Sequence, residues 1–417
     1  MKRLYLFGFL LVTAAIAVVF GVTSSDDDAI AAAPPTTSEA TATVPPPTGT
    51  DVIEGPVTIP NDIQGSVTAW TTNWNRRTID LDELELGIGG SDPRDMIRPL
   101  DSPSYETVQD ANDWLVDNEI GVLFEFEDVA RFYPLRILTA HEVVNDEAAG
   151  VPYALTYCPL CNTAAAFDRR VGDEVLRFGV SGLLRKSDLV MWDDSTESLW
   201  QQISGEGIVG DLAGTQLQFL PTATVTWSDF VERHPDGEVL SRNTGFGFNY
   251  GSNGYVGYSS RNAPIGQFFS DEVDPRFPAL ERVVGVRVGE STKAYPFSVI
   301  SEERVVADQL DGTPITVWWA DTGASDNFGS ELPGNGQAIG TGIAFLSTVG
   351  DRVLVFSADG ADTFTDADTG STWNLFGEAI EGPLKGTQLE TALHQNEFWF
   401  AWAAFNEGAP VHGSAAL

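Results

Sequence analysis

Cysteine is almost absent from this chain. Its 417 residues contain two cysteines, both in the short motif Tyr157-Cys158-Pro159-Leu160-Cys161-Asn162. Two sulfur atoms this close together suit a small local disulfide, a redox couple or a soft metal ion. No cysteine stands directly after the apolar segment near the N-terminus, where a bacterial lipoprotein carries its lipid-modified cysteine. Lipoprotein processing is therefore excluded.

Basic residues are also scarce. There are 23 Lys and Arg against 60 Asp and Glu, which gives a formal net charge of −37 and a pI near 4.1. This excess of negative charge argues against nucleic acid and against anionic lipid surfaces as partners. It fits a protein that must stay soluble in a salty or acidic medium.

Several familiar patterns are missing as well. The chain shows neither clear heptads nor an alternation of strands and helices, which argues against helical bundles and doubly wound sheets. It has no Gly-x-Ser-x-Gly element, so nothing indicates a serine hydrolase. No residue receives a catalytic role from the sequence, and whether the protein is an enzyme stays open.

The N-terminal region predicts export. After the basic start Met1-Lys2-Arg3, residues 4–22 carry no charge and are just long enough to span a bilayer. We interpret residues 1–28 as a signal peptide or an N-terminal membrane anchor, with a slight preference for the anchor. Residues 29–50, rich in Pro, Thr and Ala, predict a disordered stalk. The protein is then membrane-anchored and faces outside, or is secreted if the N-terminus is cleaved.

The rest of the chain contains an internal repeat. A segment that starts at Tyr133 recurs from Tyr295 with a constant offset (295 − 133 = 162), and Gly214-Thr215-Gln216-Leu217 recurs letter for letter from Gly386. We divide the chain into a first repeat, a connecting segment and a second, degenerate repeat, at residues 51–240, 241–282 and 283–417.

The predicted fold is mainly β, a β-rich α+β structure of two homologous repeats packed with pseudo-twofold symmetry. Apolar or alternating runs predict strands, and two segments predict short helices, the later one with Thr224 as its N-cap. The strands are expected at 121–127, 151–157, 163–168, 174–180 and 188–192, and the helices at 136–144 and 224–233. Cys158 then ends a strand, and Cys161 lies in the turn that follows.

The repeat also serves as an internal control, because residues that carry chemistry in one half only are candidates for function. Cys158 and Cys161 align with Ala320 and Gly323, His141 aligns with Glu303, and Met191 aligns with Phe364. Every soft-ligand candidate of the first half is therefore replaced in the second half by a residue that is not a soft ligand. The first half is predicted to carry the site.

Three interpretations of the cysteine pair stay open: a Cys158–Cys161 disulfide, a redox couple and a metal site. The sharpest hypothesis is a copper site in which His141 is the third ligand and Met191 the fourth, because thiolate and thioether favour Cu(I) and imidazole accepts both copper states. Asn145 or Asp146 would orient the His141 ring.

Several motifs resemble the family called domain of unknown function 3179. The resemblance covers roughly residues 90–410 and includes the runs His141–Asp146, Tyr157–Cys161, Phe178–Gly182, Thr196–Trp200 and Phe398–Trp402. It implies an exported bacterial or archaeal protein, and it supplies no mechanism. Two functions are therefore weighed: an extracytoplasmic protein with a thiol-based metal or redox site, and a non-catalytic cell-envelope module that binds or supports other components and has a local disulfide.

Overall fold

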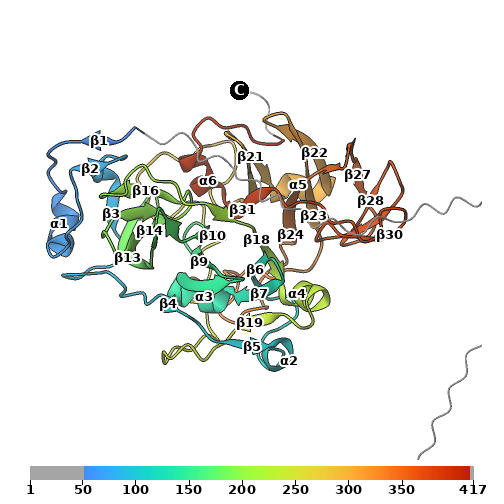
Figure 1. The fold of residues 1–417 in the computed structure, drawn as a ribbon, viewed down its shortest axis with the longest axis horizontal. Helices are drawn as coiled ribbons and strands as arrows, with labels where there is room; N and C mark the ends of the chain where they lie inside the picture. Colours follow the sequence, from blue (N-terminus) through green and yellow to red (C-terminus); the bar gives the residue numbers. More distant parts are fainter. Residues whose placement is uncertain (1–50, 414–417) are drawn as a thin grey trace, which may run out of the picture. The chain divides into compact units, whose positions relative to one another are not determined.

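Strands dominate the structure. The computed structural model describes residues 51–413, which belong to one compact unit, and its helices are short. The prediction of a mainly β protein is confirmed (Figure 1). None of the described helices is long and apolar enough to cross a membrane. The predicted anchor and stalk, residues 1–28 and 29–50, lie outside the described residues.

The largest sheet combines the N-terminal strands with four strands of the first half. Its order is β1-β2-β16-β15-β14-β13-β3. The strands are β1 (Ile53–Glu54), β2 (Arg76–Arg77), β3 (Leu84–Leu86), β13 (Phe178–Arg185), β14 (Asp188–Asp193), β15 (Leu199–Gln201) and β16 (Glu206–Val209).

Two five-stranded sheets complete the first half, with orders β17-β10-β9-β8-β4 and β18-β6-β7-β19-β5. The first contains β4 (Leu100–Asp101), β8 (Val143–Ala148), β9 (Val151–Cys158), β10 (Thr163–Asp168) and β17 (Phe219–Leu220). The second contains β5 (Tyr105–Thr107), β6 (Ile120–Phe126), β7 (Val129–Pro134), β18 (Thr222–Thr226) and β19 (Glu238–Leu240).

The second half forms three smaller sheets, with orders β21-β20-β31, β22-β23-β24 and β27-β28-β29-β30. Their strands are β20 (Arg282–Val288), β21 (Ser291–Pro296), β22 (Val305–Leu310), β23 (Thr313–Ala320), β24 (Thr341–Leu346), β27 (Phe356–Ala358), β28 (Thr363–Asp366), β29 (Thr372–Asn374), β30 (Ala379–Glu381) and β31 (Leu393–Phe398). Two short ribbons pair β11 (Arg170–Val171) with β12 (Glu174–Val175) and β25 (Thr348–Val349) with β26 (Arg352–Val353).

The helices lie between strands. They are α1 (Asn61–Val67), α2 (Val108–Ala111), α3 (Leu135–His141), α4 (Trp227–Arg233), α5 (Phe297–Glu303) and α6 (Trp399–Phe405). The predicted N-cap of α4 was wrong by two residues. Thr224 stays paired with Val122 in β6, and Thr226 caps the helix by accepting a hydrogen bond from the Asp229 amide. The predicted helix at 136–144 ends earlier, because Glu142 has a positive φ of 60° and β8 follows.

The two halves share an order of elements. The run β6, β7, α3, β8, β9 recurs as β20, β21, α5, β22, β23, and each strand in the second run begins 162 residues after its counterpart (282 − 120 = 162). After β9 and β23 the offset grows to 178 (341 − 163 = 178). The four-residue loop 159–162 of the first half stands where the second half has the longer loop 321–340. The pseudo-twofold packing stays a prediction.

A buried tryptophan anchored on an aspartate is common to both halves. The Trp200 indole donates to Asp193 Oδ2 at 2.9 Å, and the Trp373 indole donates to Asp366 Oδ2 at 2.9 Å. Each aspartate also accepts hydrogen bonds from the turn that leads to its tryptophan. Because both halves contain this network, it serves the fold and not one site.

Removing either aspartate should therefore destabilise the protein by a similar amount. In Asp193→Ala and Asp366→Ala the buried indole N–H loses its acceptor, which costs about 1–3 kcal/mol each. Urea denaturation followed by tryptophan fluorescence measures the loss. Asp368→Ala, at an exposed position two residues from Asp366, is the matched control and should change stability little. A loss confined to one half would show that the two networks are not equivalent.

Candidate metal centre

The cysteine motif forms the tip of a β-hairpin. Strand β9 ends at Cys158, the loop Pro159–Asn162 contains Cys161, and β10 returns with Thr163 opposite Cys158. Asn162 closes the loop with a positive φ of 56°, a conformation that asparagine tolerates better than most residues. Cys158 is 2% exposed and Cys161 is fully buried. Both are free thiols, so the disulfide, one of the three alternatives for this pair, is not formed.

The third member of the cluster, Asp188, comes from a neighbouring hairpin. Strands β13 and β14 are joined by the two residues Lys186 and Ser187, which have positive φ values of 52° and 66°. Such two-residue turns usually contain Asn or Gly, because other residues are strained there. Tertiary contacts hold this one: the Ser187 hydroxyl donates to the Phe268 carbonyl at 2.8 Å, and the Cys158 thiol lies 3.6 Å from the Ser187 carbonyl oxygen.

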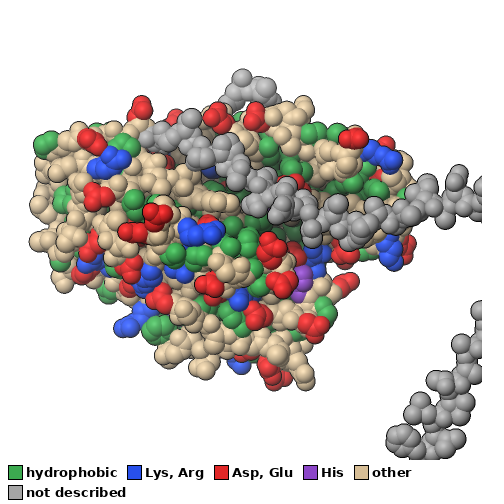
Figure 2. Space-filling model, in the orientation of Figure 1, with side chains coloured by type: hydrophobic (Ala, Val, Ile, Leu, Met, Phe, Trp, Pro, Cys, Tyr) green, Lys and Arg blue, Asp and Glu red, His purple; other side chains and the backbone are tan. Residues whose placement is uncertain are grey.

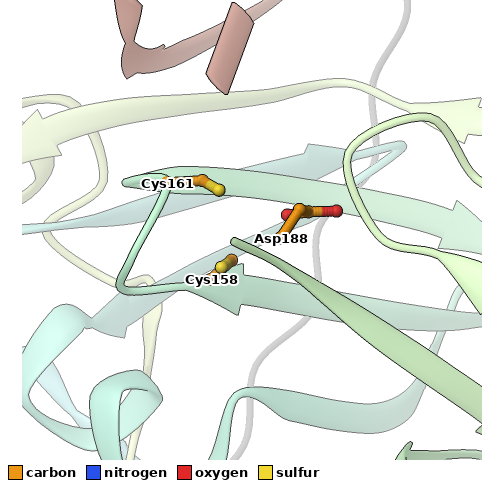
Figure 3. Close-up of side chains that lie close together, drawn as sticks. All are labelled: Cys158, Cys161 and Asp188. Atoms are coloured by element: carbon orange, nitrogen blue, oxygen red, sulfur yellow. The ribbon is translucent and has the colours of Figure 1, made fainter. Parts of the chain in front are cut away.

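These two hairpins bring three potential ligand atoms together (Figure 3). The Sγ atoms of Cys158 and Cys161 and a carboxylate oxygen of Asp188 all lie within 4.8 Å of one another. Asp188 Oδ2 accepts hydrogen bonds from the Gln201 side-chain amide at 2.6 Å and from the Ile203 backbone amide at 2.9 Å. Asp188 Oδ1 is buried and has no hydrogen-bond partner among the described residues.

The electrostatics of the cluster favour uncharged side chains. Burial raises the pKa of Cys158 and raises that of Cys161 well above its ordinary value. Burial also raises the pKa of Asp188 to about 6. Two more buried carboxyls lie close enough to interact with Asp188: desolvation raises the pKa values of Glu142 and Glu397 to about 8, and the charge of Asp188 adds to both shifts. The cluster thus gathers acidic groups that a bound cation would stabilise in their ionised forms.

The second half and the connecting segment cover this cluster. Tyr258 and Phe269 of the connecting segment and Phe328 of loop 321–340 pack in the same hydrophobic core as both cysteines. The Phe398 amide of β31 donates to the Cys161 carbonyl at 2.9 Å. Two further buried polar atoms, the Tyr258 hydroxyl and Gln202 Oε1, lack a partner among the described residues.

His141 does not join the cysteines, and this corrects the predicted ligand set. Its Nδ1 lies 2.6 Å from the Arg98 carbonyl oxygen, so this nitrogen carries the proton, and its Nε2 lies 2.6 Å from the Tyr250 hydroxyl. Both ring nitrogens are therefore occupied, and burial lowers the pKa of the ring. Asp188 occupies the place in the cluster that the sequence assigned to His141.

The predicted supporting residues also have other partners. The Asn145 side chain bonds the Phe178 backbone in both directions, at 2.7 and 2.9 Å, which ties β8 to β13. Asp146 accepts hydrogen bonds from Tyr133 at 3.2 Å and from Arg131 at 3.0 Å. Neither side chain bonds His141, so their predicted role in orienting that ring is wrong.

Met191 lies in the hydrophobic core that contains both cysteines, and it is fully buried in β14. Its aligned residue in the second half, Phe364, is buried in β28 and stacks on Trp318. A buried apolar side chain thus occupies this aligned position in both halves. Its role as a metal ligand stays a prediction.

Sequence reasoning missed Asp188, although a signal was present. With the offset of 173 that relates Met191 to Phe364, Asp188 falls on Ala361 (361 − 188 = 173). Soft-ligand residues alone do not reveal this difference between the halves, because Asp188 is a carboxylate. When carboxylates are included, the alignment of the two halves shows that only the first half has an acidic side chain at this position.

Without a bound cation, the buried Glu142 should make the protein less stable as pH rises. The pKa of Glu142 is raised by burial to about 8 in the folded state, whereas an unfolded glutamate ionises near pH 4.5. Between these values the unfolded chain has released the proton that the folded chain keeps, so stability falls with a slope of up to about 1.4 kcal/mol per pH unit. Urea denaturation from pH 5 to 8 with a chelator present measures this slope.

The isosteric variant Glu142→Gln removes one titrating group and should make the slope shallower. The part of the slope that comes from Glu397, whose pKa is also raised to about 8, should remain. Glu290→Gln, at an exposed position, is the matched control and should leave the slope unchanged. The same slope in the wild type and in Glu142→Gln would contradict the assignment of the proton to Glu142.

The chain matches a known protein family. Residues 94–409 match the family described as Protein of unknown function (DUF3179), close to the range that the motifs predicted. No curated protein and no solved structure matches the chain. The match covers more than half of the chain and includes Cys158, Cys161 and Asp188, and the protein therefore belongs to the DUF3179 family.

Proposed function

We propose that this protein binds a soft metal ion through the thiolates of Cys158 and Cys161 and the carboxylate of Asp188. One observation carries the proposal: two buried free thiols lie within 4.8 Å of a buried carboxylate whose Oδ1 has no hydrogen-bond partner among the described residues. An unpartnered buried carboxylate oxygen is costly, and a cation at this point would compensate it.

The same geometry argues against thiol exchange as the main activity. Exchange requires an accessible thiolate, which usually lies in an electropositive, partly exposed environment. Here the thiols are buried, burial raises their pKa values, and their ionisable neighbours Asp188 and Glu142 are acidic. Such surroundings disfavour a free thiolate and favour a metal-bound one.

The donor set selects among soft ions. The copper hypothesis depends on His141 as a ligand, because imidazole accepts both copper states. With Asp188 in its place, the donors are two thiolates and one carboxylate, all of them common ligands of Zn²⁺. Cu(I) prefers soft donors alone and would need the Met191 thioether. Zinc is therefore the ion that we propose, with Cu(I) as the competing outcome of the test.

Three protein ligands leave the fourth position of a tetrahedral zinc ion for water or a substrate. A closed structural zinc site has four protein ligands. The donor count here therefore fits a site that keeps one open position. Zinc bound in this way would supply a Lewis acid, and the buried Glu142 could accept or hold a proton beside it.

We also propose that the second half is a degenerate partner of the first. The aligned positions of the three ligands hold Ala320, Gly323 and Ala361. By contrast, the Tyr–Asp pairing recurs, with Tyr133 on Asp146 and Tyr295 on Asp308. The two halves thus share structural contacts, but only the first half has the three candidate ligands. This fits a duplication in which the second copy keeps only its structural role.

The acidic composition and the N-terminal segment support an extracytoplasmic location, with residues 4–22 as the link to the membrane if they remain uncleaved. Figure 2 shows acidic side chains spread over the face in view, with Lys and Arg between them. A surface of this kind attracts cations without selecting among them. Selectivity would come from the buried sulfur donors.

Metal analysis of the full chain, purified under reducing and anaerobic conditions, tests the proposal. We expect about one zinc per chain, and no metal in Cys158→Ser/Cys161→Ser, because the soft donors are gone. Asp188→Asn should weaken binding by at least about tenfold, since even residues behind a ligand cost about 10–100-fold. Competition with a chromophoric chelator measures the affinities.

Two variants separate the alternatives. His141→Ala should keep the metal, because both ring nitrogens bond elsewhere. Met191→Leu should leave zinc binding unchanged and would release copper if copper is the resident ion. Near-ultraviolet circular dichroism verifies that each variant is folded. Equal metal content in the wild type and in a folded double-cysteine variant would refute the proposal.

A further inference from the structure

A cavity of about 240 Å³ lies where the two halves meet. The second half contributes Gly285 of β20, Glu397 of β31 and Trp402 of α6 to its lining. The first half contributes Thr78 and Glu206, among others. Pockets for drug-sized ligands measure about 300–1,000 Å³, so this one suits a smaller molecule.

The cavity is not a general consequence of the fold, because the corresponding place in the first half is packed. The residues that align with Gly285, Glu397 and Trp402 are apolar and buried in one hydrophobic core cluster (285 − 123 = 162; 397 − 225 = 172; 402 − 230 = 172): Leu123, Val225 and Phe230. A Cβ on Gly285 would meet Glu397 Oε1 and Trp402 Cδ1 at 2.6 Å, so the missing side chain makes room for both. The second half thus has space and a carboxyl where the first half has apolar packing.

An arginine connects the halves where α4 of the first half meets the second half. The Arg233 guanidinium donates to Glu378 Oε2 and to Gln388 Oε1, both at 3.3 Å. Its Nε donates to Glu125 Oε1 at 3.0 Å, and its central carbon lies 4.9 Å from the Phe376 ring. At this junction a guanidinium therefore satisfies the carboxylate that the second half supplies.

At the cavity the corresponding carboxylate is present, but the arginine is not. Glu206 aligns with Glu378 (378 − 206 = 172). Phe405 of α6 aligns with Arg233 of α4 (405 − 233 = 172) and lines the cavity. Glu206 Oε1 is buried without a hydrogen-bond partner among residues 51–413, and the side chain forms no ion pair with them. Glu206 thus has no counterpart of the guanidinium that Glu378 receives.

A second free acceptor lies beside Glu206. Arg77 pairs with Val209 in an antiparallel register, and the Thr78 amide continues it by donating to the Ile208 carbonyl at 2.9 Å. Because side chains at alternate positions of a strand share a face, Thr78 and Glu206 extend from the same face of the sheet. The Thr78 hydroxyl oxygen is also buried without a hydrogen-bond partner among the described residues.

Two arginines also line the cavity, and each interacts with an acidic side chain. Arg185 pairs with Glu83 at 2.7 Å. Arg287, which aligns with Glu125 (287 − 125 = 162), interacts with Glu397. Neither arginine forms an ion pair with the unpartnered carboxylate of the first half, so that carboxylate is available to a ligand.

We propose that this cavity binds a small guanidinium compound, which pairs with Glu206 as Arg233 pairs with Glu378. Two N–H groups of the ligand donate to the Glu206 carboxylate, and a third donates to Thr78 Oγ1. The planar cation lies near the aromatic part of the lining, which includes Trp402. An alkylammonium fits less well, because it lacks the planar fork that matches a carboxylate. The proposal does not rest on a metal ion in the cysteine cluster.

Isothermal titration calorimetry with 1-butylguanidinium as the probe tests this site on the full chain, at about 0.15 M salt to screen general attraction to the acidic surface. We expect this cation to bind, and the neutral N-butylurea, which has a similar shape, to bind at least about tenfold more weakly. Glu206→Gln should weaken binding by about tenfold or more, because charge-assisted hydrogen bonds are lost. Glu378→Gln is the matched control and should leave the affinity unchanged, because Arg233 already pairs with Glu378.

The arginine of the other junction can also be copied into the cavity. In Phe405→Arg the introduced guanidinium should occupy the place of the ligand, so that 1-butylguanidinium no longer binds. Phe405→Leu removes the ring without adding a charge and should weaken binding by about fivefold at most. Near-ultraviolet circular dichroism verifies that each variant is folded.

Three results would overturn the proposal. One is equal binding of 1-butylguanidinium and butylammonium, weakened alike by Glu206→Gln and Glu378→Gln, which indicates general attraction of cations. Another is undiminished binding by a folded Phe405→Arg variant. The third is no binding by the wild type. The Cys158→Ser/Cys161→Ser variant should still bind 1-butylguanidinium, so failure of the metal proposal and failure of this one are distinguishable.

Discussion

The burial of Asp188 beside two thiols is the constraint on which the rest of this structure depends. A carboxylate removed from water needs hydrogen bonds or a cation. Here Asp188 Oδ2 accepts from the Gln201 side chain and the Ile203 amide, and the two thiols are the remaining donors near the carboxylate. The strained Lys186–Ser187 turn, the tight Cys158–Cys161 loop and the cover from the second half all serve to hold this one arrangement. Strain of this kind persists only where surrounding contacts determine the backbone, and it gathers at functional sites.

Comparison of the halves separates the parts that make the fold from the parts that make the site. The Trp–Asp and Tyr–Asp hydrogen bonds recur at matching positions in both halves. The cysteine hairpin does not recur: its four-residue loop becomes loop 321–340, and Phe328 from that loop packs against the core of the cysteines. Residues of the second half, which has no counterparts of Cys158, Cys161 and Asp188, thus help to shield these side chains from solvent.

Much of the fold could be predicted from the sequence because its signals are local. Alternating apolar residues located β6, β9, β10 and β14, and the motif itself placed Cys158 at a strand end. The members of the candidate metal centre could not be predicted in the same way. His141 bonds Tyr250, which is 109 residues away, and no local pattern reports that contact. Asp188 reaches the thiols through a turn without the Asn-Gly signal, so its position depends on tertiary packing.

Burial also bears on the extracytoplasmic location that we propose, because a thiol site there would meet an oxidising environment. Exposed cysteine pairs oxidise there, and an oxidised pair offers no thiolates to a metal ion. Cys158 and Cys161 have almost no exposed surface, and aromatic side chains of the connecting segment lie in the core around them. Oxidants and exchange partners are kept out by the same packing that raises the thiol pKa values. A bound cation would lower the pKa values of the thiols again, because it stabilises the thiolates. It would not change their burial, so oxidants would still be excluded.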